Sequence, residues 1–178
     1  YGRPLGSEFK SPYSPKDIEQ FNFNYTVSFL INQNTDAEIS ITKSEHSNDH
    51  FRPDIIDSRF LAAIKGNGGP DGDQTWNIFD SNQNSQSLID YVRGAEVSSK
   101  IADLISLNGI FNTEKKGFDL AYGFQLNRES LDIHYDEISR AEFDKDGKLI
   151  KTADLFFLGG GINLSKSRNS NAIFFELE

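Results

Sequence analysis

The chain of 178 residues contains 37% hydrophobic residues, which is enough apolar material for one folded core. Its formal net charge of −9 at pH 7 argues against a general binder of nucleic acids or anionic membranes, because clustered Lys and Arg bind phosphate groups. The absence of cysteine excludes disulfides, thiolate metal ligands and a cysteine nucleophile. No apolar run approaches the roughly 18 residues of a membrane helix, so we expect no transmembrane segment.

The N-terminal residues resemble a cloning junction. Gly6-Ser7-Glu8-Phe9 is a sequence that two adjacent cloning sites encode, and residues 4–7 resemble the remnant of a protease-cleaved tag. We therefore expect residues 1–9 to be foreign to the protein and residues 10–178 to form a single α+β domain. The chain lacks methionine, which indicates a fragment of a longer protein.

The first predicted element is a strand in which apolar side chains occupy every second position from Phe21 to Phe29. This period of two places them on one face of the strand. A polar turn over Asn32–Asp36 leads to a second strand over Ala37–Thr42, so the two strands are predicted to form a hairpin. The segment Lys43–His50 is predicted to be a polar connection.

The middle of the chain favours helices. Over Pro53–Lys65 the apolar spacing predicts a helix, with a buried strand over residues 60–64 as the alternative. Gly66–Asp73 is rich in glycine and is predicted to be a loop, followed by a short strand over Thr75–Phe79. Over Leu88–Leu107 the apolar residues fall on two helical faces that change at Gly94, which predicts two short helices joined there.

From Gly117 onward the alternation of apolar and polar residues predicts a meander of strands. The turn Asp144–Gly147 joins two of them, in a register that pairs Phe143 with Ile150 and Glu142 with Lys151. The remaining predicted elements are a strand over Leu155–Leu158, the glycine triplet Gly159–Gly161, a turn over Ser165–Asn171 and a final strand over Ala172–Leu177. We expect an α+β fold with a predominantly antiparallel sheet of about seven strands and a short helical pair packed on one face.

Two groups of residues are candidates for chemistry. Asp132, His134 and Asp136 share one face of a predicted strand, where they are candidates for a general base or a metal site. The alternative is a solvated strand face, because residues 131, 133 and 135 already occupy the core side. His46 and His50 have the spacing that lets two imidazoles on a helix share Zn²⁺ or Ni²⁺, and chance pairing in a polar loop is the alternative.

We expect a non-enzymatic protein-binding or inhibitory module of the immunity, effector or adhesin type, which uses an acidic surface and loops. The expected partner is another protein, with a basic one favoured; we expect neither nucleic acid nor a cofactor, and an extracytoplasmic or secreted location. One alternative is a hydrolase or metal-dependent enzyme that uses the Asp132, His134 and Asp136 strand face. A second alternative is a small β-barrel, either ligand-holding or of the outer-membrane type, with which the alternating strands and many aromatic residues are compatible.

Overall fold

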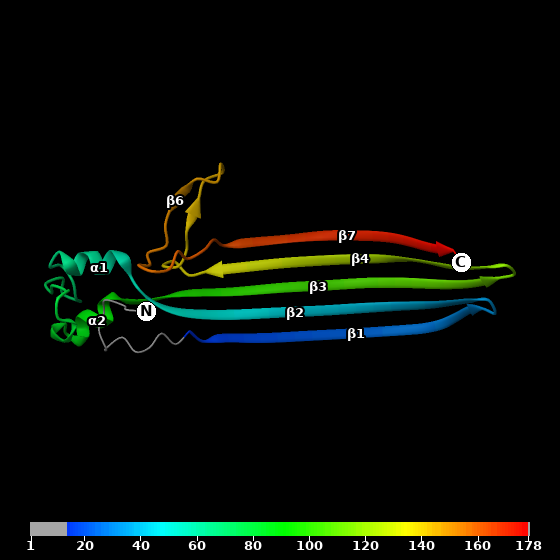
Figure 1. The fold of residues 1–178 in the computed structure, drawn as a ribbon, viewed down its shortest axis with the longest axis horizontal. Coiled ribbons are helices and arrows are strands. Elements are labelled where there is room, and N and C mark those ends of the chain that lie inside the picture. The colour runs from blue at the N-terminus through cyan, green and yellow to red at the C-terminus, as the bar shows by residue number, and fades with distance from the viewer. Residues whose placement is uncertain (1–13, 178) are drawn as a thin grey trace. The chain divides into compact units, whose positions relative to one another are not determined.

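The computed structural model describes residues 14–177, and the segment 1–9 that we interpret as foreign lies outside the described residues. The described chain is mostly antiparallel β-structure with two short α-helices, which confirms the predicted fold class (Figure 1). In chain order the elements are β1 (Lys16–Asn32), β2 (Thr35–Ile55), α1 (Asp57–Ile64), the 3-10 helix η1 (Ser81–Gln83), α2 (Gln86–Val92), β3 (Arg93–Lys115), β4 (Phe118–Tyr135), β5 (Glu142–Phe143), β6 (Leu149–Lys151) and β7 (Leu164–Leu177).

Five strands form one sheet in the order β1-β2-β3-β4-β7, and β5 and β6 form a separate hairpin (Figure 1). The strands β1 and β7 are the edges of the large sheet. Short turns connect β1 to β2 and β3 to β4, whereas the chain from β2 to β3 and from β4 to β7 is long. The predicted N-terminal hairpin is confirmed, with a shorter turn than expected, because β1 ends at Asn32 and β2 begins at Thr35.

The described chain divides into two compact units, each made of segments that are distant in sequence. Unit 1 contains the described residues up to Asp17 together with Asp49–Ser99 and Ile133–Asn163. Unit 2 contains Ile18–Asn48, Lys100–Asp132 and the chain from Leu164 onward. Because β2, β3 and β4 each contribute residues to both units, no single position along the sequence separates them.

The hydrophobic core of unit 1 is built around the two helices, α1 and α2, which contact each other. The ring of Phe60 in α1 meets the rings of Trp76 and Phe156 edge to face, at centroid distances of 5.7 and 5.3 Å. The helix predicted over residues 53–65 is therefore confirmed in type, and Gly66 follows it with a φ of +86°, which favours glycine. The core residues are Ile55, Phe60, Ala63, Trp76, Leu88, Ile89 and Val92.

A buried carboxylate anchors the segment that was predicted to be a strand over residues 155–158. Asp54 is 2% exposed, and its carboxylate accepts hydrogen bonds from the backbone N–H groups of Ile55, Phe157 and Leu158. The segment contributes a single bridge between Leu155 and Ile56 and no named strand, so the prediction of a strand there is wrong. The side chain of Asp54 supplies the partners that a neighbouring strand would otherwise provide.

The prediction of a second helix after Gly94 is wrong, because residues 93–115 form the strand β3. Only the first, α2, is helical; it begins after Ser85, whose side chain accepts a hydrogen bond from the N–H of Leu88. Val97, Ile101 and Ile105 are β-branched, and their spacing also fits the period of two of a strand. The local sequence is therefore compatible with a helix and with a strand. Pairing with β2 and β4 decides in favour of the strand.

Three polar or short segments also differ from the predictions. Residues 43–50 and 165–171, predicted to be a connection and a turn, lie within β2 and β7. Polar residues occupy both faces there, so no apolar alternation marks the strand. Residues 75–79 form no strand; instead the backbone N–H of Trp76 donates to the carbonyl of Ala63.

Of the two cross-strand residue pairs predicted for the hairpin of β5 and β6, one is present in the structure. Glu142 lies opposite Lys151, as predicted, and their side chains form an ion pair at 3.9 Å. Phe143 lies opposite Leu149 instead of Ile150, because a β-bulge shifts the register between Glu142 and Phe143.

Candidate functional site

Side-chain hydrogen bonds between neighbouring strands establish which residues share a face of the sheet in unit 2. The amide of Asn24 in β1 donates to Thr42 in β2 at 2.7 Å, and the amide of Asn108 in β3 donates to Ser40 in β2 at 3.4 Å. Because successive side chains of a strand point to opposite faces, the even-numbered residues of β1, β2 and β3 lie on one face.

The same face continues across β4 and β7. Ser106 in β3 donates to Asn127 in β4 at 2.6 Å, and the Asn127 amide donates to Ser170 in β7 at 3.4 Å. This face therefore carries the odd-numbered residues of β4 and the even-numbered residues of β7. It is lined mainly by Asn, Ser, Thr and charged side chains, and we call it the polar face.

The opposite face of unit 2 is covered with aromatic and aliphatic side chains. The rings of Phe111 in β3 and Tyr122 in β4 stack there at a centroid distance of 5.2 Å. A Cβ added at Gly109 would come within 3.1 Å of both Phe124 and Ile39, so these side chains cover the backbone of β3 from both neighbouring strands. We call this surface the apolar face, and it consists of Phe21, Phe23, Tyr25, Val27, Phe29, Ile31, Ala37, Ile39, Ile41, Ile105, Leu107, Phe111, Phe118, Leu120, Tyr122, Phe124, Leu126, Ile173, Phe175 and Leu177.

Many of these side chains are exposed, although they are apolar. At the edge strand β7, Ile173 and Phe175 are 88% and 81% exposed. The large apolar residues of β1 on this face are exposed as well, from Phe21 to Ile31. Monomeric soluble proteins rarely expose contiguous apolar patches of more than a few hundred Å². The apolar face is therefore the main candidate for a contact surface in unit 2.

The apolar face has a border at which polar side chains begin. On the same side of the sheet, Lys43 follows Ile41 in β2, Asp103 precedes Ile105 in β3, and Arg128 follows Leu126 in β4. Asp103 accepts a hydrogen bond from Ser130 at 3.3 Å, which confirms that these border residues share one side. Charged side chains therefore lie beyond the apolar residues on this side of the sheet, at this border and, as Lys115, at the turn end of β3.

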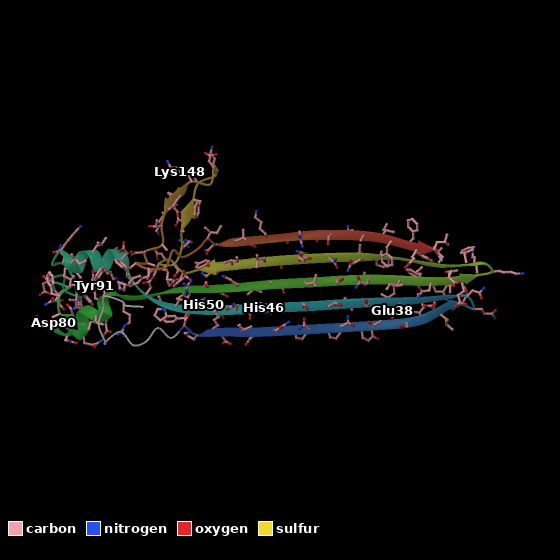
Figure 2. The ribbon with its side chains drawn as sticks, in the orientation of Figure 1. Glu38, His46, His50, Asp80, Tyr91 and Lys148 are labelled. Carbon is pink, nitrogen blue, oxygen red and sulfur yellow. The ribbon has the colours of Figure 1, made fainter. Side chains whose placement is uncertain are left out.

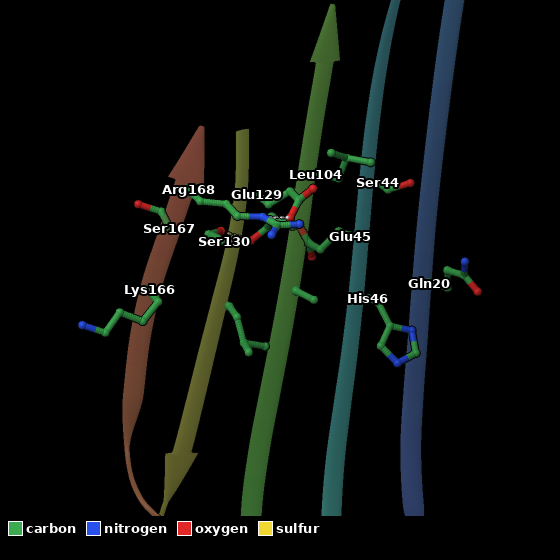
Figure 3. Close-up of a pocket in the computed structure, with 13 residues that line it drawn as sticks. Gln20, Ser44, Glu45, His46, Leu104, Glu129, Ser130, Lys166, Ser167 and Arg168 are labelled. Carbon is green, nitrogen blue, oxygen red and sulfur yellow. Dashed lines mark hydrogen bonds and ion pairs between the residues drawn. The ribbon is translucent and has the colours of Figure 1, made fainter. Parts of the chain in front are cut away.

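A cavity of about 530 Å³ lies in unit 2 among residues of all five strands of the large sheet (Figure 3). Lys166, Arg168, Glu129 and His46 line it and belong to the polar face. The Nε of Arg168 donates to a Glu129 carboxylate oxygen at 2.6 Å, and this bond and the negative charge raise the pKa of the Arg168 guanidinium above its usual value. The Arg168 guanidinium and the Glu129 carboxylate are therefore paired with each other in this cavity.

Part of the predicted catalytic row lines a cavity of about 450 Å³ in unit 1. His134 and Asp136 line this cavity together with His50, one of the two predicted metal ligands. A carboxylate oxygen of Asp136 accepts the backbone N–H of Ser139 at 2.8 Å, which stabilises the turn after β4. Asp132 belongs to unit 2. The described residues contain no group of three His, Cys, Asp or Glu side chains that could hold a metal ion.

The two predicted metal ligands, His46 and His50, are both in β2 (Figure 2). The helix on which their shared metal site depends is absent, and four residues along a strand span about 13 Å. His46 lines the cavity of unit 2, and the Nε2 of His50 lies 2.9 Å from the hydroxyl of Ser14 in unit 1. The geometry thus gives the shared site no support.

Comparison of this chain with known protein families, curated proteins and solved structures finds no match. Within residues 14–177, none of the helices has the length and apolar character needed to cross a membrane. The feature that sequence reasoning missed is the apolar face. Its signal was present in the alternating residues of β1 and β4, which we assigned to a core that unit 2 does not have.

Proposed function

We propose that the protein is a non-enzymatic binding module whose contact surface is the apolar face of unit 2. The observation that supports this is the exposure of apolar side chains on neighbouring strands from β1 to β7. Burying one Phe, Leu or Ile side chain contributes about 1.5–3 kcal/mol, so covering even part of this face would stabilise a complex. The proposed contact surface is thus an apolar sheet face, in place of the acidic surface and loops that the sequence led us to expect.

The proposal is tested by measuring which face of β1 is covered in the protein as cells produce it. The chain contains no cysteine, so Val27→Cys on the apolar face and Thr26→Cys on the polar face each introduce a single thiol. We expect a water-soluble maleimide reagent, applied to a gently prepared cell extract, to label the Thr26→Cys thiol quickly and the Val27→Cys thiol slowly.

Denaturation should equalise the two labelling rates, because it removes the cover and not the thiol. The pair is matched, since the two positions are adjacent in one strand and lie on opposite faces. Equal and fast labelling of both thiols in the folded protein would show that nothing covers the apolar face, and would refute the proposed contact surface.

A further inference from the structure

We propose that the cover of the apolar face is the hydrocarbon interior of a lipid bilayer, so that the parts of β1, β2, β3, β4 and β7 that bear this face lie in the membrane as strands. This inference rests on the proposed function, because it names what the contact surface binds. Three features of unit 2 support it: the length of the apolar segments, the kind of side chains they contain, and the connections between the strands.

In β1 and β4 the apolar segments have the length that a membrane requires of a strand. They extend from Phe21 to Ile31 in β1 and from Phe118 to Leu126 in β4. In the other three strands they are shorter, at Ala37–Ile41, Ile105–Phe111 and Ile173–Leu177. A tilted strand crosses the hydrocarbon core with about 9–11 residues. Because only every second residue faces the lipid, such a strand contains no continuous apolar run. A search for a long run of consecutive apolar residues, which detects membrane helices, therefore misses such a strand.

The chemistry of the apolar face fits acyl chains better than a protein partner. A protein interface forms roughly one hydrogen bond per 100–200 Å². The apolar face has few side chains that can form hydrogen bonds: among its residues, Tyr25 and Tyr122 carry hydroxyl groups. Beside it, Thr35 and Thr113 lie 3.2 Å apart and satisfy each other. A surface of this size with so few donors and acceptors suits a partner that forms no hydrogen bonds.

The two ends of the apolar face suit a layer with water on both sides. At one end are the tight polar turns, at residues 33–34 and 116–117. At the other end lie Lys43 and Arg128, whose long side chains can extend from apolar surroundings toward water. Short turns on one side and long connections on the other are typical of membrane-spanning sheets.

A sheet in a membrane needs suitable surroundings for its polar face and for its two edge strands. The polar face carries charged groups such as Glu38 and the Arg168–Glu129 pair, so it must face water or protein. In hydrocarbon every backbone N–H and C=O needs a partner, and within the described sheet β1 and β7 have a neighbour on one side only. The inference therefore requires additional strands beside β1 and β7, supplied by further copies of this chain or by adjoining polypeptide.

The test places an environment-sensitive dye on each face of the full chain. Single cysteines are introduced by Val27→Cys and Phe124→Cys on the apolar face, with Thr26→Cys and Gln125→Cys as the matched polar-face controls. Each variant is labelled with a nitrobenzoxadiazole dye and reconstituted into phosphatidylcholine vesicles, with or without bromine on the acyl chains. We expect a blue-shifted emission that bromine quenches for both apolar-face dyes, and neither effect for the controls.

Other outcomes separate this inference from the proposed function. Blue-shifted apolar-face dyes in lipid-free and detergent-free buffer, without quenching by brominated lipid, would show a protein cover such as a second copy. That result would overturn the lipid assignment and leave the contact surface intact. Emission typical of water from the apolar-face dyes in buffer and in vesicles alike would overturn both.

A charge substitution gives an independent measurement that does not depend on a dye. Val27→Lys places a charge in the middle of the apolar segment of β1, whereas Thr26→Lys places it on the polar face. We expect Val27→Lys to lower the folded-to-unfolded ratio in vesicles by roughly 30- to 900-fold, which is the range for a cation at the bilayer midplane. An effect of Val27→Lys no larger than that of Thr26→Lys would contradict the inference.

Discussion

Replacing Asp54 by Ala removes the carboxylate that holds residues 157–158 beside the end of β2. In the folded protein one oxygen accepts from the N–H of Ile55 at 2.8 Å, and the other accepts from the N–H groups of Phe157 and Leu158 at 3.1 and 2.8 Å. The backbone of the neighbouring Phe156 donates to the carbonyl of Ile55, so the whole segment is attached at this point.

The expected loss of stability follows from the number and kind of these bonds. Hydrogen bonds to a charged group contribute about 1.5–3 kcal/mol each. The side chains of residues 156 and 157 are exposed, so water can replace part of what is lost. We therefore expect Asp54→Ala to lower the free energy of unfolding of unit 1 by about 3–5 kcal/mol, near the upper end for single substitutions. Asp54→Asn keeps one acceptor oxygen and should cost about 1–2 kcal/mol.

The single tryptophan makes this measurement specific to unit 1. Trp76 is 4% exposed and packs against Phe60, which also contacts Phe156 in the anchored segment. Urea titrations followed by Trp76 fluorescence report the unfolding of this core, and the slope of the transition shows whether it stays cooperative. Asp71→Ala, in the exposed loop before Trp76, is the control and should change stability by less than about 0.5 kcal/mol.

The reasoning would be refuted by an Asp54→Ala variant whose transition midpoint matches that of Asp71→Ala. Such a result would mean that water or a rearranged backbone satisfies the three N–H groups without loss. Equal effects of Asp54→Ala and Asp54→Asn would indicate that the single neutral oxygen retained by Asn contributes nothing, and that the stabilisation requires the charged carboxylate.

Two further predictions concern a backbone position and a surface ion pair. Gly160 has a φ of +64°, and a Cβ there would collide with the carbonyl oxygen of Ser139, so Gly160→Ala should lower stability by about 2–4 kcal/mol in the Trp76 titration. Gly159→Ala is the control, because a Cβ there meets nothing within 4 Å; equal effects of the two would contradict the argument. Arg168→Ala removes an exposed ion pair and should leave the thermal unfolding midpoint, followed by circular dichroism, nearly unchanged, because water already surrounds both charges. A clear decrease of the unfolding midpoint would contradict this prediction and would show that the Arg168–Glu129 ion pair stabilises unit 2.

The sequence predicted best where one physical constraint acted alone. In residues 21–29 every second side chain is large and apolar, a pattern that fits a strand and no helix, and β1 contains it. In residues 97–107 the apolar side chains fit both a strand and a helix, and the prediction failed. Cross-strand hydrogen bonds such as Ser106 to Asn127 decide this segment, and they join residues that the sequence does not relate.

The candidate sites show the same limit. The spacing of Asp132, His134 and Asp136 along a strand was visible in the sequence, but the division of the row between the two units was not. The spacing of His46 and His50 suggested a shared metal only under the assumption of a helix, and β2 removes that assumption. Asp54 had no distinguishing sequence pattern, because its three N–H partners come from the adjacent residue and from a segment about a hundred positions away.

The sequence by itself determined the fold class and the separation of apolar from polar side chains in β1 and β4, since a strand of alternating residues has two unlike faces whatever surrounds it. Only the tertiary structure decided that five such strands place their apolar sides together, and that the helices build the core of unit 1. The physical reason is that alternation is a local property of the backbone. Register, strand order and burial depend on contacts between distant segments, and these appear only when the chain is folded.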